Sequence, residues 1–220
     1  MSITTTLLAD VSAEVFRRVH GFAADQDVRY YLNGVHLVPG RTKQQAVRME
    51  GTNGHLLYCE EDKSAVVQAE LIVSIGKRGR TLLRGSNRIK VYSDKAVHIT
   101  DQSGAVLYIE PCNGVIDGKF PVIDHLVGVP ADWHEGLVAP VNTGYLMQAL
   151  SIPGYVRFFS RRDKEGAPDM KSSVMFIMDG GTANGGKAFG LIMPTRGQFA
   201  PDSGVDAMLP DSLVQPRAAA

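Results

Sequence analysis

Apolar residues near the start of the chain recur at helical spacing. Four of them follow one another at intervals of four, four and three residues: Val11, Val15, Val19 and Phe22. This spacing places them on one face of a helix. It therefore predicts a helix over residues 11–24, with Arg17 and Arg18 off the apolar face.

Short runs rich in Val, Ile, Leu and Tyr fill most of the remaining chain and are separated by turn residues such as Asn-Gly and Pro-Gly. Runs of this kind are typical of β-strands. Strands are predicted over residues 29–38, 45–52, 54–62, 69–75, 87–94, 96–101, 105–111, 136–141, 155–161, 172–179 and 187–194. Two further short helices are predicted over residues 80–85 and 143–150, the second beginning after the capping residue Asn142.

The order of these elements repeats along the chain. A strand, a helix and three strands occur three times in succession, in units of about 60 residues without obvious sequence identity. This order indicates an α+β fold and not a Rossmann-type alternation. Beyond Arg196 the chain is rich in Pro, Ser and Ala and has no sustained period. Most of that segment is therefore predicted to be mobile.

Composition narrows the class of protein. The 220 residues are 44% hydrophobic, which is enough for a substantial core. No apolar run approaches the roughly 18 residues of a membrane span, and the N-terminus lacks the features of a signal peptide. We therefore expect a cytoplasmic protein without a membrane partner. Cys59 and Cys112 lie far apart without metal-ligand spacing, so neither a zinc site nor a disulfide framework is indicated.

Basic residues are unevenly distributed although the formal net charge is zero, with 23 Lys and Arg against 23 Asp and Glu. The net charge therefore predicts no general attraction to nucleic acid. The stretch over residues 77–90, however, holds six basic residues and no acidic one. Only local charge of this kind could bind a phosphate backbone.

Several motifs, in this order along the chain, resemble segments of one known family. They are DVRYYLNG (27–34), GTNGHLL (51–57), DGKFPVIDHLVGVP (117–130), and NTGYLMQAL (142–150) with LIMPTR (191–196). Together they resemble the bacterial DNA polymerase III β subunit, the sliding clamp, in a shortened and divergent form. The resemblance implies a DNA-clamp fold built from repeated strand-helix-three-strand units.

The resemblance also implies a domain organisation. Residues 1–130 would form a clamp domain like the family's middle domain, residues 131–196 a half-domain like the second half of its last domain, and residues 197–220 a mobile C-terminal tail. An unpaired half-domain would expose sheet edges and one side of its core. Self-association is the simplest cover, and a ring of twelve units would need four chains of three units each. We therefore expect a homo-oligomer, either a dimer or a tetramer.

The family binds DNA polymerase and other partners, through their clamp-binding peptide motifs, in an apolar cleft between the middle and last domains. Carried over by motif, its walls here would be Arg29, Leu32, Thr52, His55, Leu57, Pro121, Leu126, Leu191, Met193, Pro194 and Arg196. Leu, Met and Pro surfaces suit the burial of a peptide's Leu or Phe. The alternative is that the four leucines among them are plain core residues. Leu56, His125 and Thr195 depart from the family's usual residues, so peptide specificity could differ.

The family also lines its ring with helices whose basic side chains contact double-stranded DNA without reading its sequence. The corresponding residues here are Arg17, Arg18, Lys77, Arg78, Arg80 and Arg84. The alternative is an ordinary solvated basic face. The third helix, over residues 143–150, has no basic residue, which weakens the case for a ring lining.

No segment of the sequence matches a complete catalytic or cofactor-binding motif. Residues 181–187 fit the GxxxxGK spacing of a phosphate-binding loop, but Ala188 replaces the Ser or Thr that would hold magnesium, and a strand-like segment follows. The six histidines show no metal-ligand spacing, and no nucleophile has a sequence-defined partner. We expect no cofactor, no metal and no enzymatic activity, and we interpret Trp133 as a packing residue.

Two main functions are consistent with these features. The first is a sliding-clamp-like processivity factor that encircles DNA and tethers a polymerase through the cleft. The second is an interaction protein that keeps the cleft and binds or competes for replication partners without encircling DNA. A purely structural role for the fold is a third, minor possibility.

Overall fold

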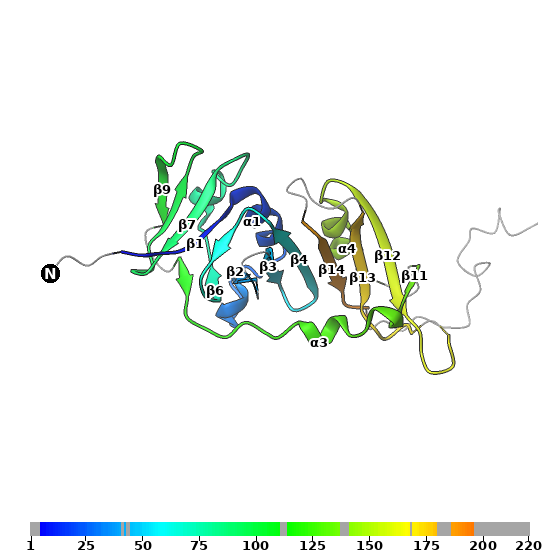
Figure 1. The fold of residues 1–220 in the computed structure, drawn as a ribbon. Coiled ribbons are helices and arrows are strands. Elements are labelled where there is room, and N and C mark those ends of the chain that lie inside the picture. The colour runs from blue at the N-terminus through cyan, green and yellow to red at the C-terminus, as the bar shows by residue number, and fades with distance from the viewer. Residues whose placement is uncertain are drawn as a thin grey trace, which may run out of the picture.

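The computed structural model describes residues 5–40, 42, 45–110, 114–136, 141–167, 169–179 and 186–195. Within these ranges the strands form two antiparallel sheets (Figure 1). One sheet has five strands in the order β5-β1-β7-β8-β9. The other has nine, in the order β10-β6-β2-β3-β4-β14-β13-β12-β11. The predicted α+β fold class is confirmed.

The elements follow the predicted repeat. The first unit contains β1 (Leu7–Ser12), α1 (Ala13–His20), β2 (Val35–Val38), β3 (Val47–Thr52) and β4 (Leu56–Asp62). The second contains β6 (Leu71–Val73), α2 (Lys77–Arg80), β7 (Arg88–Tyr92), β8 (Val97–Thr100) and β9 (Val106–Glu110). The third contains α4 (Thr143–Leu150), β12 (Tyr155–Arg161), β13 (Val174–Asp179) and β14 (Ala188–Ile192). We call β4, β9 and β14 closing strands, because each ends its unit.

One short element, η1 (Tyr30–Leu32), lies inside the first unit, between α1 and β2. The others lie between the units and are β5 (Val66–Val67), β10 (Val115–Ile116), α3 (Asp124–Val127), η2 (Pro130–Asp132) and β11 (Trp133–Glu135). The strand predicted over residues 136–141 falls mostly on residues 137–140, which lie outside the described ranges. Its last residue, Val141, forms an isolated antiparallel bridge with Pro194.

Helix α1 begins two residues later than its apolar spacing predicts. Ser12 caps the helix by accepting a hydrogen bond from the backbone N–H of Val15 at 3.4 Å. Val11 belongs to strand β1, where it pairs with Ile89. Val11 therefore lies in a strand although its spacing matched the helix. Strand β1 and helix α1 pack into the same hydrophobic core, so the apolar spacing continues from one into the other.

Helix α2 is displaced from its predicted position. The structure places it over Lys77–Arg80, whereas the sequence predicted residues 80–85. Gly79 explains the shift, because a Cβ there would lie 2.6 Å from the side chain of Ile75 and 2.8 Å from the ring of Tyr108. The helix therefore forms around Gly79, the residue that packs most closely against these two side chains. Leu83, which suggested the later helix, is buried just beyond it.

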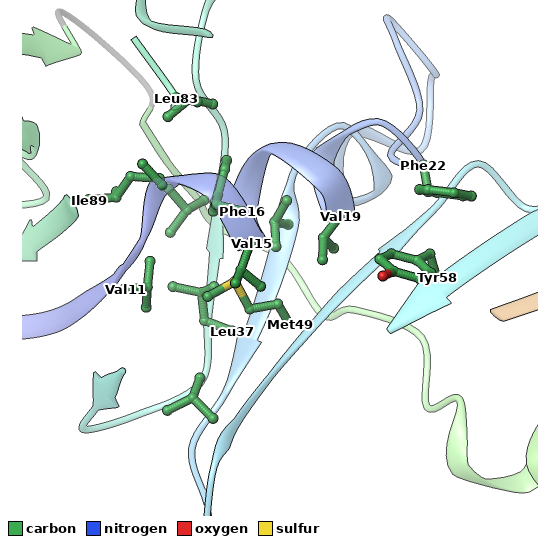
Figure 2. Packing of buried hydrophobic residues seen from close by; sticks show 14 of the residues in the cluster. Val11, Val15, Phe16, Val19, Phe22, Leu37, Met49, Tyr58, Leu83 and Ile89 are labelled. Atoms are coloured by element: carbon green, nitrogen blue, oxygen red, sulfur yellow. The ribbon is translucent and has the colours of Figure 1, made fainter. Parts of the chain in front are cut away.

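Two hydrophobic clusters cover the two faces of the nine-stranded sheet. The larger cluster packs α1 against the sheets, with Val15, Phe16 and Val19 buried beside Leu37 and Met49 (Figure 2). The second cluster lies on the opposite face, beneath the segment that carries α3. Residues of β4 alternate between the two clusters, as strand geometry requires.

The closing strands β4 and β14 join the first unit to the third. They pair antiparallel from Glu60 opposite Ala188 to Leu56 opposite Ile192. Gly190 makes this close approach possible, because a Cβ there would clash with the ring of Phe176 and with the carbonyl oxygen of Leu57. The two parts of the chain therefore share one continuous sheet (Figure 1).

Candidate functional site

The junction of β4 and β14 carries the centre of the predicted cleft. Leu57 lies directly opposite Leu191 in the sheet, and Leu32 of η1 packs in the same cluster. The three side chains are only 2% (Leu32), 4% (Leu57) and 3% (Leu191) exposed. Phe120 and Ile123 cover them from the linker between the two parts. These three leucines are therefore core residues, which was the alternative interpretation of the sequence. They form the buried floor of the predicted cleft and not an open wall.

A tight turn between β3 and β4 presents His55 at the edge of this floor. The hydroxyl of Thr52 accepts a hydrogen bond from the Gly54 N–H at 3.0 Å and donates one to the Leu56 carbonyl at 2.9 Å. The His55 carbonyl accepts a hydrogen bond from the Met193 N–H at 2.9 Å, which ties the turn to the end of β14. The imidazole stacks on Tyr145 of α4, with ring centroids 5.8 Å apart. His55 thus contacts both parts of the chain.

Three of the predicted wall residues are exposed. Met193, which is hydrogen-bonded to the turn, is 44% exposed. Leu126 of α3 is 40% exposed, and Pro121 of the linker is also exposed. Pro194 is half-buried at its bridge to Val141. Arg196, the remaining predicted wall residue, lies outside the described residues.

Arg29 lies above the same turn. Its guanidinium forms an ion pair with Asp27 at 2.7 Å and would lie 3.0 Å from a Cβ at Gly54, whose φ is +87°. The Arg29 hydrogen bond lowers the pKa of Asp27 to about 2. The left-handed backbone at position 54 therefore favours glycine, whose missing side chain also leaves room for the guanidinium.

An apolar pocket of about 400 Å³ lies farther along the same sheet, over the third unit. It is lined by Val127, Trp133, Phe159, Met175, Ile177, Met178, Lys187, Ala188 and Phe189. None of the predicted wall residues lines it. The sequence feature that could have indicated this pocket is the uninterrupted apolar run of β13, because it places apolar side chains on both faces of the strand.

Trp133 closes one side of this pocket as a packing residue, as predicted. Its indole N–H donates a hydrogen bond to the Val127 carbonyl at 2.7 Å. The guanidinium of Arg161 lies 4.7 Å from the Trp133 ring centroid and donates hydrogen bonds to the carbonyls of Leu126 and Val127. This arrangement holds the end of α3 against the third unit.

One residue of the predicted DNA-binding set is not available as a free cation. Arg18 forms an ion pair with the fully buried Glu60 at 2.6 Å and a second one with Glu14 at 3.1 Å. Tyr58 donates a hydrogen bond to Glu60 at 2.9 Å, and burial beside that carboxylate raises the Tyr58 pKa. The Arg18 guanidinium is therefore held by two carboxylates inside the fold, and its assignment to DNA contact stays a prediction.

The other predicted basic residues gather around α1 and α2. Arg17, Lys77, Arg78 and Arg84 are exposed, and Arg80 is half-buried. Burial, with the positive charge of Arg80 acting in the same direction, lowers the pKa of His20 to about 4. The end of α1 therefore lies close enough to Arg80 for their charges to interact. We call Arg17, Lys77, Arg78, Arg80 and Arg84 the basic surface.

The third unit exposes large apolar side chains. Met147 and Leu150 of α4 are 66% and 48% exposed, and Tyr155 of β12 is 84% exposed. Apolar groups of this size on one helix and the following strand commonly mark an interface. In the part of the chain that the structure describes, no helix is long and apolar enough to cross a membrane.

Solved structures of bacterial sliding clamps have the same fold. The DNA polymerase sliding clamp of Pseudomonas aeruginosa matches with a TM-score of 0.61 and 18% identity, over 86% of this chain and 67% of the clamp. The β clamp of Helicobacter pylori matches with a TM-score of 0.60 and 14% identity, over 86% and 67%. The pol III β of Caulobacter crescentus matches with a TM-score of 0.57 and 17% identity, over 90% and 68%.

These matches confirm the predicted DNA-clamp fold. The chain spans about two thirds of the length of each of these clamps. No protein-family model and no curated protein sequence matches the chain.

Proposed function

We propose that this chain is a sliding-clamp-like processivity factor of DNA replication, which tethers a polymerase or other partners through a peptide bound at the β4–β14 junction. The observation that carries the proposal is the meeting of His55 and Met193 at the junction, within a fold shared with sliding clamps. The domain boundaries expected from the sequence, residues 1–130 and 131–196, place this junction between the two parts.

The peptide site combines a rigid floor with an adaptable rim. Leu57 and Leu191 are held by the sheet, whereas Met193 and Leu126 are substantially exposed and free to pack against an incoming side chain. A thioether side chain adapts to apolar groups of different shapes. The partner would therefore be a short peptide with Leu or Phe, which buries its apolar side chain against Met193 and Leu126.

A peptide-binding measurement tests this part of the proposal. Met193→Ala and Leu126→Ala should each raise the Kd for a fluorescent peptide containing Leu and Phe about tenfold, the equivalent of about 1.4 kcal/mol. Met147→Ala is the matched control, because Met147 is an exposed methionine of α4 that is not among the predicted cleft residues. Equal affinities for the three variants and the wild-type chain would reject the site.

Encirclement of DNA is the second part of the proposal. Homo-oligomerisation would have to close a ring, and the exposed face of Met147, Leu150 and Tyr155 supports self-association of the third unit. The basic surface would then contact the phosphate backbone without sequence specificity. Retention on circular DNA, with loss after linearisation, is the expected result.

A triple variant tests the basic surface. Replacing Lys77, Arg78 and Arg84 by Ala should reduce retention and its dependence on salt. The matched control replaces three exposed basic residues of the third unit, Arg162, Lys164 and Lys171. Equal loss with both variants would contradict a localised DNA contact.

A second candidate function is favoured by the ion pair of Arg18 with Glu60. This pair removes one cation from the DNA-binding set, and α4 supplies no basic residue. The alternative is therefore an interaction protein that binds or competes for replication partners without encircling DNA. Peptide binding without retention on circular DNA would favour it over the processivity factor.

A further inference from the structure

The two sheets end in four edge strands of unequal character. The edges are β5 and β9 in the five-stranded sheet and β10 and β11 in the nine-stranded sheet. Strands β5 and β10 have two residues each and β11 has three, whereas β9 has five. An edge strand presents unpaired backbone N–H and C=O groups, so a longer edge offers more of them to a partner. The edge formed by β9 is the longest in the described part of the chain.

The side chains of β9 are also unusually apolar for a sheet edge. Val106, Leu107 and Ile109 are 51%, 45% and 52% exposed. Natural edges are commonly protected by a Lys, a Pro or a bulge. Strand β9 has no Lys or Pro, and its register shift lies near its beginning, which leaves residues 108–110 in regular pairing with β8.

Strand β9 is held rigidly on its own side. The ring of Tyr108 packs against Gly79 of α2, and the Glu110 carboxylate accepts a hydrogen bond from the Gly76 N–H at 2.9 Å. These contacts fix the side chains that point toward α2. The exposed apolar side chains and the outer backbone groups are therefore presented in a preorganised strand, which lowers the entropic cost of pairing.

The chain itself shows what kind of partner fits a closing strand. Of the three closing strands, β4 and β14 pair antiparallel with each other. The third, β9, pairs only with β8 among the described residues. Among the described residues, β4 and β14 already pair with each other, so β9 is the closing strand whose outer edge is still open. The β9 strand of a second copy is an equivalent partner for that edge.

We propose that β9 pairs antiparallel with β9 of a second copy of this chain about a two-fold axis. The pairing would make one continuous sheet from the five-stranded sheets of two chains. The strand has a single charged residue, Glu110, at its end. Two antiparallel copies centred on Leu107 or Tyr108 place the two Glu110 side chains at opposite ends, so no like charges face each other.

The β9 contact would be one interface of the proposed homo-oligomer. Its part in closing a ring rests on the proposed function, whereas the strand pair itself does not. A second two-fold contact through Met147, Leu150 and Tyr155 would alternate with it along the assembly. Two alternating two-fold contacts can close four chains of three units each. The β9 contact itself requires neither DNA nor a bound peptide.

Light scattering of the full chain tests the β9 contact. Ile109→Lys should halve the mass of the assembly, because a charge added within the paired edge blocks pairing. Val66→Lys is the matched control, since Val66 is a 63% exposed valine on β5, the opposite edge of the same sheet. A wild-type monomer, or an Ile109→Lys variant with the wild-type mass, would overturn the inference.

Hydrogen exchange of the wild-type chain gives a measurement that needs no variant. The amides among residues 106–110 that face away from β8 should become protected as the protein concentration rises, whereas those of β5 should not change. Protection independent of concentration would contradict the pairing. Mass loss in Ile109→Lys with no retention of the wild-type chain on circular DNA would support the β9 contact and reject the clamp function, so the two failures are distinguishable.

Discussion

Leu57 on β4 lies directly opposite Leu191 on β14, and this pair joins the first unit of the fold to the third. Both side chains are buried under the linker residues Phe120 and Ile123. The burial of this pair distinguishes two kinds of cleft residue, buried and exposed, that the sequence could not distinguish. Residues of the floor hold the two parts together, whereas residues of the rim are free to contact a partner.

Leu191→Ala and Met193→Ala should therefore differ in their effects. Truncating the buried Leu191 leaves a cavity and should lower the free energy of unfolding by about 2–5 kcal/mol. Truncating the exposed Met193 should lower it by less than about 1 kcal/mol, while weakening peptide binding. Urea unfolding measures the first effect and fluorescence anisotropy the second. Equal stability of the two variants would contradict the assignment of floor and rim.

Arg18→Met should be far more destabilising than Arg17→Met. Removing the Arg18 guanidinium leaves Glu60 charged and fully buried, which costs about 3–5 kcal/mol in comparable sites. Arg17, its neighbour on α1, is exposed, and its replacement should change the free energy of unfolding by less than about 0.5 kcal/mol. Thermal or urea unfolding measures both. In a DNA-retention assay the order reverses, since only Arg17 belongs to the basic surface.

Stability should fall in mild acid because of His20. Burial lowers its pKa to about 4 in the folded chain from 6.5 in the unfolded chain. The unfolded chain therefore binds the additional proton in this window, and the free energy of unfolding decreases as the pH falls from about 6.5 to about 4, by at most about 1.4 kcal/mol per pH unit. Partial solvent contact of the ring reduces the slope.

A histidine substitution isolates that contribution. His20→Gln should flatten the dependence of the free energy of unfolding on pH within this window, as measured by urea unfolding at several pH values. His125→Gln is the control, because His125 is exposed. If His20→Gln and the wild-type chain lose stability in parallel, other groups dominate the acid response.

Arg161→Met should release the end of α3 from the third unit. The variant loses the hydrogen bonds to the Leu126 and Val127 carbonyls and the stacking on Trp133. Each lost hydrogen bond is worth about 1 kcal/mol. The emission of Trp133, the single tryptophan of the chain, should shift to longer wavelength, and proteolysis near α3 should accelerate.

Arg162→Met is the control for that experiment. Arg162 is the next residue in the chain, and its guanidinium donates a hydrogen bond within its own exposed loop, to the Gly166 carbonyl. Its replacement should leave the Trp133 emission unchanged. A spectral shift in both variants would indicate a general loosening of β12 instead of a specific release of α3.

Local pattern predicted much of the secondary structure. The helix over residues 143–150 was predicted with its correct bounds, and its cap is confirmed, because the Asn142 side chain accepts a hydrogen bond from the Gly144 N–H at 2.8 Å. Most strand runs of the three units were also identified, since runs rich in Val, Ile, Leu and Tyr between turn residues are local features of the sequence. Residues 30–32, predicted as part of a strand, form the 3-10 helix η1 instead. Helix α2 was misplaced because its position depends on Tyr108, which lies in a different strand.

The candidate site was only partly accessible to the same reasoning. The resemblance of the motifs predicts that His55, Met193 and Leu126 belong to one site, but it does not tell which of their neighbours are buried. The pocket beside Trp133 was missed, because its lining combines α3 with three strands of the third unit and Trp133 itself. The spacing of apolar residues within one helix or strand does not reveal a pocket that several elements form together.

The sequence by itself determined the order of the strands and helices, the repeat of three units and the resemblance to a clamp, because each depends on residues close together in the chain. Only the tertiary structure decided which leucines form the floor, that Arg18 is neutralised by Glu60, 42 residues away, and that β9 ends its sheet with an apolar edge. These properties depend on burial and pairing between distant segments. Their energies arise only when the sheets are assembled, so no local pattern can specify them.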